Sequence, residues 1–331
     1  MKKEFKLDIP VLIIFFNRPN MLKKVFEQVK IVKPSKLYLY QDGPRKNRLD
    51  DMDNIQRCRE IVDDVDWECE VFTMYQENNV GCDPSEYIAQ KWMFSSETMG
   101  IILEDDDVPS QSFFYFCKEL LIRYEKDTRI NMICGMNNLE TYDCPYDYVF
   151  TTSETITGWA SWKRVIDEWE PKVSFVNNSY YEKIYLNTFN SQFNAKEILE
   201  RYKEQNEEGI AYYESILSSS AKMGSRLNIV PTKNLISNIG NEGESTHGGS
   251  SIDVLPKGIR SIFNMKTYEY DFPLIHPPYV IEDINFRNKL YRKMGVGHPW
   301  ICLWRHIESI FLRIKAGEIQ SIINNVKRRF K

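Results

Sequence analysis

Four consecutive carboxylates, Glu104 to Asp107, form the stretch of this sequence best suited to chemistry. They follow the apolar residues 101–103, so the pattern predicts a buried strand that ends in an acidic loop. Like charges packed together destabilise a fold unless a positive group lies among them. A hard divalent cation carrying a phosphorylated ligand would balance this cluster. A solvated acidic turn is the alternative, but open α/β sheets bind ligands at the carboxyl ends of their strands, which favours a binding site.

Two further polar residues follow apolar runs in the same way. Arg18 comes after residues 11–16 and could pair bidentately with a phosphate. Asp42 comes after residues 36–40 and could accept hydrogen bonds from a base or a ribose. Taken singly, Arg18 could be a surface cation and Asp42 a turn-forming residue. Together with the acidic run, they indicate one site at the carboxyl edge of a sheet.

Apolar runs and helical patterns alternate through the first hundred residues, which is how a sheet could bring these groups together. This βαβαβαβ order predicts an α/β fold with a mostly parallel central sheet flanked by helices. The strands are expected at 10–16, 36–40, 70–74 and 100–103, and the helices at 21–32, 53–65 and 84–96.

The second half of the sequence continues with less regular patterns. Residues 171–208 look like a helical elaboration on the core, and residues 234–251 form a long polar stretch rich in glycine. Such a stretch is expected to be a lid loop. Further helices are expected at 112–124, 163–169 and 210–222, and further strands at 130–136, 148–156 and 227–230.

Composition excludes several classes of protein. The 331 residues are 42% hydrophobic, enough for a large core, and the net charge of −4 offers no basic field for nucleic acid. The seven cysteines form no CxxC pair and are expected to be reduced thiols of a cytosolic protein. No P-loop or dinucleotide-binding glycine motif occurs, so neither a Walker-type kinase nor a Rossmann dehydrogenase is indicated. The short apolar run near the N-terminus predicts no signal peptide and no membrane span.

Residues 300–331 form a C-terminal tail that combines an apolar stripe with basic residues. The stripe begins with Trp300, and Arg305, Arg313 and Lys315 flank it. A basic amphipathic helix of this kind is typical of a membrane-surface element, and a helix packed on the protein's own core is the equal alternative.

The chain is therefore expected to divide into two parts. The first, residues 1–255, would contain a nucleotide-binding half (1–110) and an acceptor half (111–255) that includes the lid loop. The second, residues 256–331, would be a C-terminal extension with the basic amphipathic helix.

Several of these motifs resemble the N-acetylglucosaminyltransferase I group of glycosyltransferases, which has the GT-A fold, and bacterial surface-polysaccharide glycosyltransferases of the same group. The resemblance covers roughly residues 8 to 250. The motifs that carry it are Asn17-Arg18-Pro19, Gln41-Asp42, Glu104-Asp105-Asp106 before Phe113-Phe114, Gly158-Trp159-Ala160-Ser161-Trp162, and residues 234–240 before Ser245-Thr246-His247.

The resemblance implies a role for most of the candidate residues. Arg18 would contact the donor diphosphate, Asp42 the uracil, and Glu104 and Asp105 the ribose and the sugar. Asp106 would be the main protein ligand of Mn²⁺, or of Mg²⁺ in its place.

The catalytic base implied by the resemblance is Glu214, although the group has aspartate at this place. The alternative for Glu214 is an exposed helix carboxylate without a catalytic role. His247 is expected to contact the donor, and its alternative is a loop residue without a binding role. Trp159 and Trp162 could stack on a sugar or fill the core. A histidine that the group places near the uracil has no counterpart in residues 87–92.

The expected function is that of an inverting, metal-dependent glycosyltransferase of the hexosyltransferase type. It would move a sugar from a nucleotide donor, a UDP-sugar such as UDP-GlcNAc, to a glycan or lipid-linked oligosaccharide acceptor in surface-polysaccharide biosynthesis. The expected location is the cytoplasm, with residues 300–331 in peripheral contact with the inner face of the cytoplasmic membrane.

Two alternatives to glycosyl transfer stay open. A nucleotidyltransferase acting on sugar phosphates would need a second metal-binding carboxylate and usually a glycine-rich N-terminal loop, where this chain has Asn17-Arg18-Pro19-Asn20. The second alternative is a membrane-associated scaffold that has lost catalysis. The intact carboxylates at 104–107 argue against it, because a scaffold does not require them.

Overall fold

The computed structural model describes residues 7–189, 192–209, 212–241 and 252–318. Its described strands form an eight-stranded sheet in the order β3-β2-β1-β4-β8-β6-β9-β7 and a two-stranded sheet of β10 and β5. The strands are β1 Val11–Phe15, β2 Lys36–Gln41, β3 Glu70–Tyr75, β4 Met99–Glu104, β5 Asp107–Pro109, β6 Ile130–Cys134, β7 Tyr148–Thr151, β8 Trp159–Trp162, β9 Leu227–Pro231 and β10 Ile236–Asn238.

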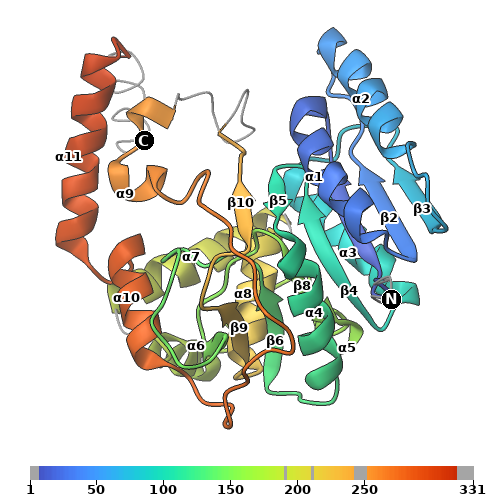
Figure 1. Cartoon of the computed structure of the whole chain (residues 1–331). Coiled ribbons are helices and arrows are strands. Elements are labelled where there is room, and N and C mark those ends of the chain that lie inside the picture. Colours follow the sequence, from blue (N-terminus) through green and yellow to red (C-terminus); the bar gives the residue numbers. More distant parts are fainter. Residues whose placement is uncertain (1–6, 190–191, 210–211, 242–251, 319–331) are drawn as a thin grey trace.

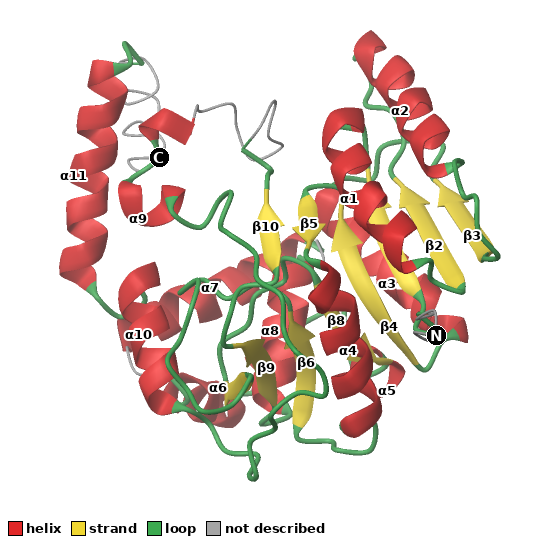
Figure 2. Ribbon diagram, viewed as in Figure 1, coloured by secondary structure: helices red, strands yellow, loops and turns green. Residues whose placement is uncertain are grey.

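Helices cover the large sheet, as Figures 1 and 2 show. They are α1 Pro19–Val32, α2 Leu49–Val62, α3 Cys82–Ser96, α4 Gln111–Arg123, α5 Lys163–Ile166, α6 Ser179–Asn187, α7 Gln192–Glu208, α8 Tyr213–Met223, α9 Lys257–Arg260, α10 Ile284–Met294 and α11 Pro299–Lys315, with 3-10 turns η1 Ser174–Asn177 and η2 Ile252–Val254.

The predicted α/β fold with a mostly parallel sheet is confirmed. β3, β2, β1 and β4 run parallel, and β6 runs parallel to β9, whereas β8 and β7 are antiparallel to their neighbours. β1 shows why its sequence is apolar throughout. Val11, Ile13 and Phe15 enter the core on one face of the sheet, and Leu12 and Ile14 enter the core on the other. A strand buried on both faces needs a continuous apolar run.

The two faces of the sheet have different helical covers. Side chains of α1, α2 and α4 belong to the first core, and side chains of α3, α5, α8 and α10 to the second. The predicted elaboration at 171–208 forms η1, α6 and α7 around a small core of its own, which includes Phe175, Tyr185 and Tyr202. Trp159 and Trp162 are buried in the two main cores, so both fill the interior.

Residues 234–251 were predicted to be a loop throughout, and this prediction was wrong for the first residues of the segment. Ile236–Asn238 forms β10, which pairs antiparallel with β5 directly after the acidic turn. The predicted strand at 148–156 is also shorter, because β7 ends at Thr151. Residues 242–251 of the predicted lid loop lie outside the described residues.

Residues beyond 255 join both main cores, although they were expected to form a separate extension. Met265, Tyr270 and Leu274 pack in the first core, and Phe286 and Leu290 of α10 pack in the second. The boundary at 255 stays a prediction, and the packing shows that part of the second segment completes the first.

Candidate active site

The acidic run lies at the point where the strand order of the sheet reverses. β1 pairs with β2 on one side and with β4 on the other, so the segments that follow β1 and β4 diverge. In open α/β sheets the crevice outside the strand ends at such a point is the usual ligand site. The turn after β4 contains Asp105 and Asp106, and the turn after β1 contains Arg18. The structure therefore brings together two of the segments that the sequence singled out.

Arg18 is the cation that balances the carboxylates. Its guanidinium forms an ion pair with Asp105, and its Nη1 donates to Oδ2 of Asp106 over 3.0 Å. Its Nε also lies 3.3 Å from Oδ2 of Asp105. Burial opposes the charged form, but the two aspartates outweigh it and raise the pKa of Arg18. The α1 helix begins at Pro19, whose ring suits the first helical position, and this places Arg18 at its N-cap.

Asp107 supports the fold of the site. Its Oδ2 accepts hydrogen bonds from the backbone N–H of Gly158 at 2.7 Å and of Glu104 at 3.3 Å. These contacts tie the acidic turn to the start of β8. Glu104 is half-buried at the end of β4, and burial together with Glu86 and the aspartates raises its pKa well above its usual value.

Asp42 is a buried carboxylate at the end of β2, and its oxygens are already engaged. Oδ1 accepts from the N–H of Gly43 and of Val80, and Oδ2 accepts from the N–H of Gly81 and the side chain of Asn79, all within 3.1 Å. A carboxylate offers about four acceptor positions. A nucleotide base would therefore have to displace one of these contacts, and the role of Asp42 toward uracil stays a prediction.

Glu86 is a carboxylate near the site that sequence reasoning missed. It lies on α3, 5% exposed, and its Oε2 accepts from Gln90 Nε2 at 3.0 Å. Burial, with a smaller contribution from Asp105 and Asp106, raises the pKa of Glu86 to about 8. A signal was available, since Glu86 and Gln90 fall on the same helical stripe as the buried Ala89 and Met93. Polar residues on a buried stripe often have a function.

Glu214 lies in the first turn of α8 and is exposed. The N–H of its neighbour Tyr213 donates to Oδ1 of Asp83, in the first turn of α3, at 3.2 Å. Because α3 begins at the carboxyl edge of the sheet, Glu214 lies at the same edge as the acidic turn. Burial and then the charge of Glu86 raise the pKa of the Tyr213 phenol well above its usual value, and Glu104 contributes as well.

The strand β10 closes over the acidic turn. The N–H of Ile239 donates to the carbonyl of Asp106 at 2.9 Å, and Asn238 pairs with Asp107. Gly240 then passes so near the site that a Cβ built on it would lie 2.1 Å from Oδ2 of Asp106. Only glycine fits here while Asp106 keeps this position. His247 falls in residues 242–251, outside the described part of the chain.

Replacing Gly240 by alanine should therefore displace the Asp106 carboxylate without unfolding the protein. We expect ligand binding at the acidic turn to weaken by about 100-fold, the scale on which misplaced active-site groups act. Calorimetry with UDP and Mn²⁺ measures binding, and circular dichroism checks the fold. Ser237→Ala in the same strand is the matched control, and equal binding by the two variants would contradict the prediction.

The carboxylate oxygens suit a hard cation, but the protein alone does not surround one. Within the described ranges, no group of three or more His, Cys, Asp or Glu side chains is placed to hold a metal ion. Asp106 is also engaged by Arg18. The donor set thus fits a divalent cation only where a ligand such as a diphosphate supplies most of the coordinating oxygens.

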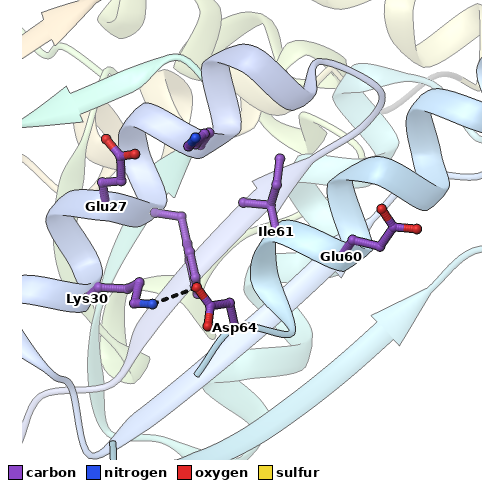
Figure 3. A pocket seen from close by; sticks show the side chains of 7 residues that line it. Glu27, Lys30, Glu60, Ile61 and Asp64 are labelled. Atoms are coloured by element: carbon purple, nitrogen blue, oxygen red, sulfur yellow. Dashed lines mark hydrogen bonds and ion pairs between the residues drawn. The ribbon is translucent and has the colours of Figure 1, made fainter. Parts of the chain in front are cut away.

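A shallow pocket between α1 and α2 is distinct from this site (Figure 3). Lys30 and Asp64 form an ion pair of 2.7 Å across it. The pocket is lined by side chains of both charges and by Phe26 and Ile61. Lys30 belongs to the last turn of α1, far along the helix from Arg18, so this pocket takes no part in the chemistry of the acidic turn.

Fold and site together define an α/β protein with a cluster of charged residues at the switch point of its mostly parallel sheet. No family model matches the chain, and no curated protein matches it. Similar solved structures include HddC from Yersinia pseudotuberculosis, at 10% identity over 49% of this chain and 80% of that chain, with a TM-score of 0.31.

Two others are a UDP-glucose pyrophosphorylase and the inositol-1-phosphate CTP transferase from T. maritima. The first has 9% identity over 70% of this chain and 93% of that chain, with a TM-score of 0.36. The second has 8% identity over 73% and 91%, with a TM-score of 0.39. At these TM-scores the likenesses establish no family for this chain. The resemblance to the N-acetylglucosaminyltransferase I group finds no support among them.

Proposed function

We propose that this protein is a transferase that binds a nucleotide sugar at the acidic turn and transfers the sugar to an acceptor hydroxyl. The observation that carries the proposal is the meeting of Arg18 with the 104–107 carboxylates at the switch point of the sheet. Such a site can hold a diphosphate in two ways. Arg18 supplies a bidentate donor for the phosphate oxygens, and the carboxylates would hold a divalent cation that offsets the charge of the diphosphate.

Asp106 is the protein ligand proposed for Mn²⁺ or Mg²⁺, and Glu104 and Asp105 are proposed to face the ribose and the sugar. The bound cation would stabilise negative charge on the departing diphosphate. Arg18 would add to this stabilisation by turning from the carboxylates to a phosphate oxygen. Asp42 is proposed to lie beside the base and His247 beside the donor.

Glu214 is the proposed catalytic base. It lies at the carboxyl edge of the sheet and is exposed, so an acceptor can reach it. Its carboxylate would take the proton of the acceptor hydroxyl while the oxygen attacks the anomeric carbon. The bond from that carbon to the diphosphate oxygen breaks on the opposite face, and the nucleoside diphosphate leaves. This single displacement inverts the anomeric configuration.

Nucleotidyl transfer to a sugar phosphate is the second candidate, and Glu86 favours it. This buried residue feels the charges of Asp105 and Asp106, and it is our candidate for the second metal-binding carboxylate that this reaction needs. Against it, the connection from β1 to α1 consists of residues 16–18, with no glycine-rich loop to hold a triphosphate. The names UDP-glucose pyrophosphorylase and CTP transferase denote nucleotidyltransferases, but structural similarities with such low TM-scores do not decide between the two reactions. The choice between them therefore rests on experiment.

Two assays with Mn²⁺ separate the candidates, one with a panel of nucleotide sugars and one with nucleoside triphosphates and sugar 1-phosphates. Glycosyl transfer predicts release of the nucleoside diphosphate from a UDP-sugar. Nucleotidyl transfer predicts release of pyrophosphate from a nucleoside triphosphate and a sugar 1-phosphate. Activity in neither assay would favour a non-catalytic scaffold.

Asp106→Ala is expected to weaken Mn²⁺-dependent UDP binding by at least about tenfold, because it removes the proposed protein ligand. Calorimetry with and without Mn²⁺ measures the change. Asp64→Ala is the control, since Asp64 is an exposed carboxylate two residues after the end of α2, and this variant should bind UDP as the wild type does. If Asp106→Ala and the control bind UDP equally, the metal role of Asp106 is wrong.

A further inference from the structure

The C-terminal helix α11 is attached to the protein by its polar face and turns its apolar face outward. Seven of its large apolar residues recur at spacings of three and four and are about half exposed or more, with Trp300 at 80% and Trp304 at 67%. The two others, Ile301 and Leu312, are partly buried. The full stripe consists of Trp300, Leu303, Trp304, Ile307, Ile310, Phe311 and Ile314. A helix on the surface of a globular protein normally has the opposite orientation.

The contacts on the inner face explain this orientation. The Arg305 guanidinium donates to the carbonyls of Lys293 and Met294 at the end of α10, the second at 2.7 Å. Glu308 accepts from the N–H of Lys257 at 3.0 Å, at the start of α9. Figure 1 shows α11 at the left edge of the molecule, next to α9 and α10. The sequence allowed two alternatives for this helix, contact with a membrane and packing on the protein's own core. The observed geometry excludes packing of the stripe on the described core.

We propose that the outer face of α11 lies on an anionic lipid surface. Two tryptophans at the start of the stripe suit the boundary between headgroups and acyl chains. Lys315 in the last turn of α11 is an exposed cation, whereas Arg260 on the adjoining α9 lies 4.0 Å from the exposed carboxylate of Asp253. In sequence, residues 319–331 add Lys327, Arg328, Arg329 and Lys331 and no acidic side chain. Basic residues beside an apolar helix face draw it to anionic lipids.

The helix is suited to lie along a membrane and not to cross it. Its 17 residues extend about 25 Å, and its inner face carries Arg305 and Glu308. A search of the helices in the described chain finds none that is long and apolar enough to span a bilayer. A second copy of the chain is a poorer occupant, since its own basic residues would come to the same surface.

This proposal is independent of the transferase reaction, because it is tested without donor or acceptor. The full-length protein is mixed with phosphatidylcholine vesicles with or without phosphatidylglycerol, and the bound fraction is measured by flotation. The wild type should float with the anionic vesicles only, and less so at high salt. Trp304→Ala and Phe311→Ala should each weaken binding by about tenfold.

Tyr180→Ala is the matched control, since Tyr180 is an equally exposed aromatic residue on α6. It should bind the vesicles as the wild type does. Equal flotation with both kinds of vesicle would overturn the anionic requirement. Absence of flotation would overturn the proposal. Sedimentation would then show whether the protein is a monomer or a dimer, and a dimer that Trp304→Ala dissociates would identify a second copy of the chain as the occupant of the apolar face.

Discussion

Replacing Arg18 by alanine is expected to lower the free energy of unfolding by about 3 kcal/mol and to abolish binding of a nucleotide sugar. Arg18 is the cation between Asp105 and Asp106, and both carboxylates are buried. Removing one partner of such a group leaves the other charges uncompensated, which costs about 3–5 kcal/mol. Chemical denaturation measures the stability, and calorimetry with UDP and Mn²⁺ measures the binding.

Two comparisons isolate the effect of Arg18 from a general loss of charge. Lys30→Ala removes another cation of α1, whose ion pair with Asp64 is exposed, and should change stability little. Adding Asp105→Asn to Arg18→Ala removes one uncompensated carboxylate and should recover part of the lost stability. Binding should not recover, because the proposed phosphate contact is still missing. An Arg18→Ala variant as stable as Lys30→Ala would show that the carboxylates are not held by this cation.

Replacing Glu214 by glutamine is expected to lower the rate of glycosyl transfer by about 10²–10⁴-fold while leaving donor binding unchanged. Glutamine keeps the size of the side chain but cannot take the proton of the acceptor hydroxyl. The donor would lie over the acidic turn, whereas Glu214 comes from the first turn of α8. Its loss should therefore affect turnover and leave the Kd for UDP unchanged.

Steady-state rates with the best donor from the panel, together with calorimetry, test this prediction. Glu200→Gln on α7 is the control, since Glu200 is also an exposed helix carboxylate and contacts Lys203. It should retain full activity. Unchanged turnover in Glu214→Gln would remove this residue from the role of base, and loss of UDP binding would place it in the donor site instead.

Much of the fold could be predicted because the deciding signals are local. The run of apolar residues in β1 and the spacing of apolar residues in α1 reflect which faces of each element are buried. Their alternating order along the chain then implies a parallel sheet. The acidic run could be placed at a strand end for the same reason, since the change from apolar to charged residues marks where β4 leaves the core.

Contacts between distant segments could not be predicted in this way. The pairing of β10 with β5 joins residues more than a hundred positions apart, and the glycine-rich composition of residues 234–251 concealed it. Glu86 was passed over because its importance depends on its electrostatic coupling to Asp105 and Asp106, which lie far from it in the sequence. The direction of the apolar face of α11 depends on the hydrogen bond that Arg305 donates to α10 and on the one that Glu308 accepts from α9.

The sequence by itself determined the kind of elements, their order and the residue types present at the ends of β1, β2 and β4. The tertiary structure alone decided which of these residues meet. It paired Arg18 with Asp105 and Asp106, gave Asp107 a structural contact to Gly158, and brought Gly240 against the carboxylate of Asp106. The physical reason is that periodicity records burial along one element, whereas charge compensation and close approach arise only between elements that are packed together.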